Sequence, residues 1–98
     1  MNKLRQLQIL LTKIPKGKVT TYGILAKKLK IHPRVVGKLL SKNIYLNKYP
    51  CYKVVLSSGK IGGYSIGLKN KIKRLRKDGI KIKNNKVNLK NYLFAFKR

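Results

Sequence analysis

Residues 19–43 contain two helical patterns joined by a tight connection, and this arrangement constrains the fold more than any other feature. The first pattern, "VTTYGILAKKLKI", begins at an N-cap threonine, Thr20 or Thr21. The second, "PRVVGKLLSKN", begins at Pro33, because proline is favoured at a first helical position. Two short helices of this kind, the second rich in basic residues, predict a helix-turn-helix. The positions expected to face inward are Leu25, Ala26, Leu29, Val36, Leu39 and Leu40.

Two further helices are expected on either side of this pair. Apolar side chains recur at helical spacing over residues 3–14, until the proline and glycine of "IPKGK" break the pattern. Ser65 can cap another helix over Leu68–Lys77, and Gly79 is well placed to end it.

The remaining segments have the character of short strands. Residues 52–64, "YKVVLSSGKIGGY", predict a β-hairpin that turns at Ser57–Gly59. Residues 80–98 form a C-terminal tail that predicts a second hairpin around Asn84-Asn85, followed by an apolar end. Together the elements predict a mixed α/β (α+β) fold, a single winged-helix-like domain over residues 1–98 with a small β-hairpin wing.

The charge balance indicates a polyanionic partner. The chain has 26 Lys and Arg against one acid, Asp78, for a net charge of +25. Such a chain repels itself, and binding to nucleic acid relieves that repulsion. A composition bias toward lysine also contributes to the high net charge. An anionic membrane surface is the alternative, but the sequence has no long apolar span and no lipidation signal to favour it. We therefore expect nucleic acid as the partner and no membrane.

Cysteine and histidine usage excludes several classes of site. One Cys cannot form an internal disulfide, which is typical of a reducing compartment. One Cys, one His and one Asp cannot supply an ordinary tetrahedral metal site, so we expect no metal and no other cofactor. We expect a monomer in the cytoplasm, associated with the nucleoid, or in the nucleus if the source is a eukaryote.

Four segments in fixed order carry a resemblance to a known family. They are "IPKGKVTTYGILAKKL", "PRVVGKLLSKN", the dipeptide "PC" and "SSGKIGGYSIGL", with no gap needed between Asn43 and Asp78. In this order the chain resembles, over about residues 3–80, the DNA-binding and active-site domain of the methylated-DNA–protein-cysteine methyltransferases. It also resembles their relatives, the alkyltransferase-like proteins. Many members have a separate N-terminal domain, which we expect to be absent here.

The resemblance implies DNA repair by stoichiometric alkyl transfer, with double-stranded DNA as the nucleic-acid partner. In the family, a cysteine thiolate attacks the alkyl carbon on O-6 of a guanine that has been flipped out of the duplex, and keeps the alkyl group. The resemblance places that cysteine at Cys51. A downstream repair nuclease is a further possible partner.

The same resemblance assigns roles to other positions. Arg34 matches the arginine that replaces the flipped base, on the helix that lies in the minor groove. Tyr22 matches the tyrosine that crowds the flipped nucleotide and helps to protonate guanine, and Asn43 matches an asparagine that braces the active-site loop. The implied DNA-binding set is Arg34, Thr21, Tyr22, Pro33, Gly37, Lys38 and Ser41. The implied lesion pocket is Val54, Tyr64 and Ser65.

Each of these residues also has an ordinary structural interpretation. Tyr22 can be a core aromatic, Arg34 one phosphate contact among many, and Asn43 a helix terminator. Their joint occurrence at family spacing favours the functional interpretation. His32 is expected to be a cap or a surface residue without a chemical role.

The chain departs from the family at the site itself. The family signature is Pro-Cys-His-Arg, whereas here Tyr52 and Lys53 follow Pro50-Cys51. The family histidine, oriented by a glutamate, takes the thiol proton through a water. The glutamate position falls on Asp78, and we expect Tyr52 to donate a hydrogen bond to it.

Tyr52 is a poor substitute for the histidine as a base. A phenol ionises near pH 10 and a thiol near pH 8.5, so proton transfer between them is uphill at neutral pH. Positive surroundings lower a cysteine pKa, and Lys48 and Lys53 are near in sequence. We therefore expect Cys51 to be a slower but real nucleophile.

Three hypotheses follow from these observations. The retained Cys51, with Tyr52, Asp78, Asn43 and Tyr22 as its catalytic surroundings, favours an active alkyltransferase. The lost histidine favours a non-catalytic protein that binds O-6-alkylguanine and flags it for other repair. The charge alone is compatible with a basic architectural DNA protein, which would bind damaged and plain duplex equally.

Overall fold

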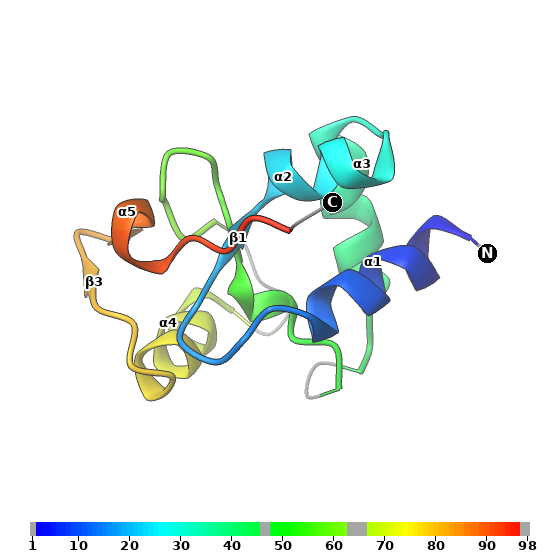
Figure 1. The fold of residues 1–98 in the computed structure, drawn as a ribbon. Coiled ribbons are helices and arrows are strands. Elements are labelled where there is room, and N and C mark those ends of the chain that lie inside the picture. Colours follow the sequence, from blue (N-terminus) through cyan, green and yellow to red (C-terminus); the bar gives the residue numbers. More distant parts are fainter. Residues whose placement is uncertain (1, 46–47, 63–66, 97–98) are drawn as a thin grey trace.

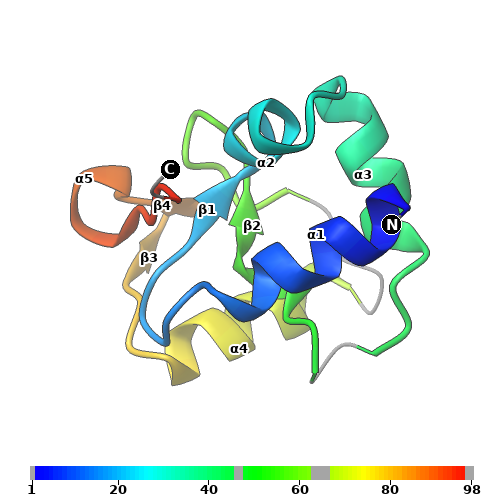
Figure 2. The ribbon, with the colours of Figure 1, turned by 45° about the vertical axis from the view of Figure 1, so that its right-hand side comes forward.

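Helices occupy both ends of the fold and two short strands lie between them. The computed structural model describes residues 2–45, 48–62 and 67–96. Helices α1 to α3 form one end, and α4, the β3–β4 hairpin and α5 form the other (Figures 1 and 2). The elements are α1 (Lys3–Thr12), β1 (Thr20–Thr21), α2 (Tyr22–Leu29), α3 (Pro33–Ser41), the 3-10 turn η1 (Cys51–Lys53), β2 (Val54–Val55), α4 (Leu68–Lys77), β3 (Ile82–Lys83), β4 (Lys86–Val87) and α5 (Leu89–Tyr92). This confirms the mixed helix-and-small-sheet architecture.

Local capping explains where the two helices of the central pair begin. The Thr21 hydroxyl accepts the Ile24 backbone N–H at 3.1 Å and starts α2. His32 Nδ1 accepts the Arg34 backbone N–H at 3.1 Å, and Pro33 occupies the first position of α3. The predicted threonine cap and the capping role of His32 are therefore confirmed, and α2 and α3 pack against each other.

The prediction of a β-hairpin over residues 52–64 was wrong in its strand pairing. The turn is present, since the Gly59 N–H donates to the Leu56 carbonyl at 2.8 Å, but β2 pairs in parallel with β1. Beyond the turn, Lys60 pairs with Lys86 of β4. The physical reason is burial, because Val54 and Val55 are both fully buried on opposite sides of the strand. Val54 packs in the helical core, the cluster of α1 to α3 that includes Leu11 and Leu25, and Val55 packs in the second core, the cluster that includes Leu75 and Val87. Burial on both faces is typical of a parallel strand.

The C-terminal segment contains the second hairpin, which is confirmed. Asn84 and Asn85 have φ values of 53° and 58°, as a two-residue hairpin turn with left-handed central residues requires. The sequence did not predict α5, which follows it. After α5 the chain runs beside β1, where the Phe94 N–H donates to the Val19 carbonyl at 2.7 Å. The apolar end of the tail thereby packs on the helical core through Phe94 and Phe96.

Helix α4 has the predicted bounds, and Gly79 follows its end with a φ of 88°. Its N-cap residue is Gly67, and Ser65, the expected cap, lies outside the described residues. Within the described ranges, the helices are all too short or too polar to cross a lipid bilayer.

Thr20 and Thr21 offer a matched pair of stability tests. The Thr20 hydroxyl is fully buried and has no hydrogen-bond partner, whereas the Thr21 hydroxyl caps α2. We expect Thr20→Val to raise the free energy of unfolding by about 1–3 kcal/mol, because an unsatisfied buried group is removed at constant shape. Thr21→Val should lower it by about 0.5–2 kcal/mol through loss of the cap. Urea unfolding of both variants measures the difference, and a less stable Thr20→Val protein would contradict this account.

Candidate active site

Cys51 begins the η1 turn and is held by a buried asparagine from the end of α3. Its side chain is 5% exposed, and the Asn43 side chain hydrogen-bonds to it. Asn43 is also buried, and its amide nitrogen donates to the Tyr49 carbonyl at 2.8 Å. The Asn43 carbonyl oxygen accepts the Tyr45 N–H at 3.3 Å. The side-chain amide of Asn43 therefore holds Tyr45 and Tyr49, which lie near the two ends of the loop that precedes Cys51.

Burial and nearby cations act on the thiol in opposite directions. Burial raises the pKa of Cys51 above its ordinary value, and this effect dominates. The Asn43 hydrogen bond and the charges of Lys71 and Arg74 lower the same pKa, so they oppose the burial. The thiol is thus protonated at neutral pH in the free protein, but it faces two cations that favour the thiolate.

The cations near the thiol are not those expected from sequence proximity. Lys48 lies over the Tyr49 ring, with its ammonium 5.5 Å from the ring centroid. Lys53 is buried, and its ammonium donates to the Ile14 carbonyl at 2.9 Å. Both ammonium groups therefore have other partners, and the cations that lower the pKa of Cys51 are Lys71 and Arg74.

Lys71 on α4 was missed in the sequence. Its side chain is fully buried, and its ammonium donates to the Val54 carbonyl at 2.6 Å. Burial lowers the pKa of Lys71 to about 8, and the Cys51 charge raises it. The position lies four residues before buried Leu75, on the inward face of α4, and this spacing was the available signal.

Tyr52 and Asp78 form a separate contact behind the thiol. The Tyr52 hydroxyl donates to Asp78 Oδ2 at 2.6 Å, which confirms the expected hydrogen bond. Two cations lie over the Tyr52 ring, with the Arg74 guanidinium carbon at 5.5 Å and the Lys53 ammonium at 5.9 Å from its centroid. This contact ties η1 to the last turn of α4.

Tyr22 is the first residue of α2 and an electrostatic neighbour of the thiol. Burial raises the pKa of Tyr22, and the Cys51 charge raises it further. Its phenol therefore keeps its proton near neutral pH and can donate a hydrogen bond.

The implied DNA-binding residues divide into two groups. Pro33, Arg34, Lys38 and Ser41 are exposed on α3, and the space beside Gly37 is open. Thr21 is 4% exposed and occupied as a cap, so its side chain lies apart from that surface.

The implied lesion pocket is only partly described. Val54 is fully buried in β2, so its side chain is part of the core. Only its backbone can contribute to the lesion pocket. Tyr64 and Ser65 lie outside the described residues. Within the described ranges, no three His, Cys, Asp or Glu side chains gather as a metal site.

Comparison with known proteins places this arrangement in a family. The family model for the DNA-binding domain of 6-O-methylguanine DNA methyltransferase matches residues 4–80. The chain belongs to this family. The match contains α1 to α4, the thiol and its surroundings, and it ends before the β3–β4 hairpin.

Two curated relatives are identical to this chain at about half of the aligned residues. A bifunctional methyltransferase/endonuclease of Picrophilus torridus is 51% identical over 87 residues, which are 87% of this chain and 29% of the relative. A methylated-DNA–protein-cysteine methyltransferase of Saccharolobus solfataricus is 50% identical over 70 residues, which are 71% of this chain and 46% of the relative. This methyltransferase-family chain thus spans less than half the length of these curated relatives.

Two solved structures show the same fold. The O6-methylguanine-DNA methyltransferase of Pyrococcus kodakaraensis is 37% identical with a TM-score of 0.76, over 82% of this chain and 47% of that one. Atl1 of S. pombe, in complex with damaged DNA containing O6-carboxymethylguanine, is 25% identical with a TM-score of 0.84. That alignment covers 95% of this chain and 94% of Atl1.

Removal of the buried ammonium tests its effect on the thiol. We expect Lys71→Met to raise the pKa of Cys51, because a positive charge that favours the thiolate is lost. The measurement is the rate of Cys51 alkylation by iodoacetamide as a function of pH, followed by protein mass. The rate should fall most below pH 8, where Lys71 is charged. Lys69→Met, an exposed neighbour on the same helix, is the control, and equal profiles for the two variants would contradict the assignment.

Proposed function

We propose that this protein repairs DNA by moving an alkyl group from O-6-alkylguanine in a duplex to Cys51. The observation that carries the proposal is the buried thiol, held by Asn43 and facing Lys71 and Arg74, within the family match. In the transfer, the Cys51 sulfur forms a bond to the alkyl carbon while the bond from that carbon to guanine O-6 breaks. The thioether is stable, so each molecule reacts once.

The two protons of this reaction have separate routes. The neutral fraction of Lys71, whose pKa burial lowers to about 8, accepts the thiol proton, and the resulting ammonium stabilises the thiolate together with Arg74. Tyr22, protonated in the free protein, gives its proton to the guanine as the electron pair returns to O-6, and it then takes a proton from solvent. Tyr52 serves as a brace, because its hydroxyl proton is already committed to Asp78.

The exposed face of α3 is the surface that we propose for the damaged duplex. Arg34 lies in its first turn, and Lys38 lies one turn further along the same face. Arg34 would enter the minor groove and fill the space left by the flipped base. The DNA complex of Atl1, which shares this fold, supports the assignment.

A non-catalytic lesion binder is the second candidate. Two observations favour it: the protein shares its fold with Atl1 over nearly the whole of both chains, and burial raises the pKa of Cys51. In this case the site around Cys51 would hold the alkylated base without reaction.

The name of the Picrophilus torridus relative joins a methyltransferase to an endonuclease. We propose that this protein, acting as a monomer on DNA, cooperates with a separate nuclease in the same repair process.

Protein mass after exposure to damaged DNA tests the proposed transfer. A duplex with one O-6-methylguanine should add the mass of one CH2 unit to the protein, located at Cys51 by peptide analysis, whereas Cys51→Ser should stay unchanged. An unmodified Cys51 after prolonged excess of duplex would exclude transfer. Lesion-dependent binding would then indicate the second candidate, and equal affinity for plain duplex would indicate an architectural protein.

Restoring the family histidine tests the interpretation of Tyr52. We expect Tyr52→His to raise the single-turnover rate by about tenfold or more, because a positioned general base contributes about 10²–10⁴-fold and Asp78 is in place to orient it. Tyr52→Phe, which keeps the ring and removes the hydroxyl, should show no gain. A rate that is unchanged in Tyr52→His would mean that proton removal from Cys51 does not limit transfer.

A further inference from the structure

Helix α4 presents a dense group of cations that the alkyl-transfer site does not use. Lys69, Lys73, Arg76 and Lys77 are all exposed on it, and we refer to these four as the α4 patch. Lys69, Lys73 and Arg76, with Ile72 between them, line a shallow hollow of about 390 Å³. The sequence has one acid, Asp78, and its carboxylate accepts the Tyr52 hydroxyl. The patch therefore lines a hollow, and α4 itself carries no Asp or Glu that would offset its positive charge.

The spacing of the patch suits a line of phosphates. Lys69, Lys73 and Arg76 are four and three residues apart, so they lie on one face at successive steps of about 6 and 4.5 Å along the helix axis. Like charges at these spacings destabilise a bare helix. A polyanion along the same face reverses that effect, because each phosphate neutralises a cation and releases counterions.

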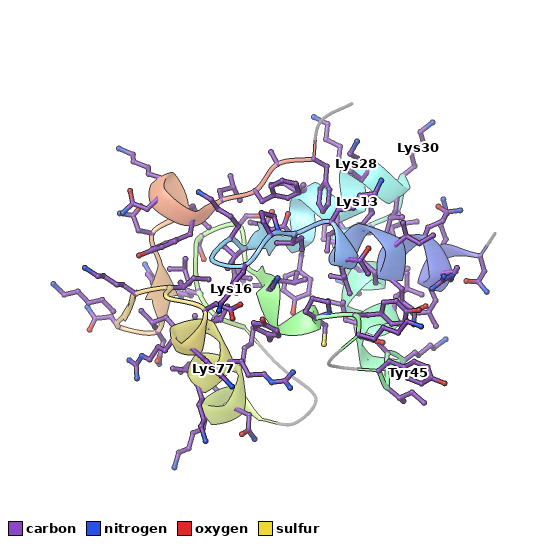
Figure 3. All side chains as sticks on the ribbon, turned by 60° about the horizontal axis from the view of Figure 1, so that its bottom comes forward. Lys13, Lys16, Lys28, Lys30, Tyr45 and Lys77 are labelled. Carbon is purple, nitrogen blue, oxygen red and sulfur yellow. The ribbon has the colours of Figure 1, made fainter. Side chains whose placement is uncertain are left out.

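The patch lies away from the surface proposed for the damaged duplex. In both ribbon views α3 and α4 lie at different ends of the molecule, with β1 and β2 between them (Figures 1 and 2). Figure 3 shows Lys77 on α4 well apart from Lys30, which ends α2 next to α3. The fold measures 36 × 27 × 21 Å, whereas the Debye length is about 8 Å at physiological salt. A duplex on α3 therefore leaves most of the potential of the α4 patch unneutralised.

We propose that the α4 patch binds the phosphate backbone of a second DNA duplex, so that one molecule bridges two duplex segments. A protein with two such faces can pass from one duplex to another without first dissociating. The inference rests on the part of the proposed function that places a duplex on α3, and it is independent of alkyl transfer to Cys51. It requires no sequence recognition, because phosphate contacts carry none.

Charge reversal on the patch, compared with an equal reversal elsewhere, tests the proposal. The test variant is K69E/K73E/R76E. The control, K13E/K83E/K90E, changes three exposed lysines on separate parts of the fold by the same total charge. Plain biotinylated duplex on beads is mixed with protein and a free fluorescent duplex, and the captured fluorescence is measured. We expect the wild-type protein and the control to capture the free duplex, and the test variant to capture at least about tenfold less, since three phosphate contacts are lost.

Single-duplex binding by the same variants separates the possible outcomes. Affinity for one duplex, measured with DNA in excess, should be similar for the test variant and the control, whereas R34E/K38E should fall to the weaker affinity of the α4 patch alone. Equal capture by test and control variants would overturn the second face while leaving the α3 surface intact. If the test variant loses single-duplex binding and R34E/K38E keeps it, the duplex lies on α4, and both the bridging proposal and the α3 assignment are overturned.

The rate of exchange provides a second readout. Release of a bound fluorescent duplex should become faster as the concentration of plain competitor duplex rises, for the wild-type protein and the control only. A release rate independent of competitor concentration in the wild-type protein would overturn transfer between segments. Sedimentation of the free proteins accompanies both assays, and capture that depends on wild-type dimers would overturn bridging by one molecule.

Discussion

A buried ammonium group joins the two ends of this molecule. Lys71 extends from α4 to the Val54 carbonyl of β2, and β2 pairs with β1 between the helical core and the second core. Burial of a charge is costly unless it is compensated, so this contact fixes α4 against η1 and β2. Cys51 lies three residues before Val54, and the position of the thiol therefore depends on the same hydrogen bond.

The same group opposes the effect of burial on the thiol, because its positive charge lowers the pKa of Cys51 while burial raises it. Exposed lysines near a DNA site lose much of their effect when phosphates neutralise them. Lys71 is fully buried, so its field on Cys51 is screened much less by solvent or salt. In the alkyl transfer that we propose, Lys71 and Arg74 would stabilise the thiolate as fixed charges in place of the family's histidine, and Tyr52 would brace the site through its hydrogen bond to Asp78.

Sequence patterns predicted correctly those caps, helix bounds and turns that depend on residues close together in the chain. The bounds of α4, the Thr21 and His32 caps and the Asn84-Asn85 turn follow from residues within a few positions of each other. The partner of β2 did not follow, because a two-residue strand takes its partner from tertiary packing. Lys71 was hidden for a related reason. Lysine is almost never fully buried unless paired, so its place on the inward stripe of α4 gave a weaker signal than Leu75.

The shortage of acids determines how cations are held within this fold. Where many proteins pair a lysine with a carboxylate, here the ammonium groups donate to backbone carbonyls: Lys3 to Leu29 at 2.7 Å, Lys53 to Ile14 at 2.9 Å and Lys71 to Val54 at 2.6 Å. Leu29 is the last residue of α2, where the helix dipole favours a cation. A carbonyl satisfies an ammonium group without bringing the negative charge that a carboxylate would add, so the protein keeps a large net positive charge. The buried lysines therefore serve the fold, whereas the lysines of the surface that we propose for DNA, such as Lys38, are exposed.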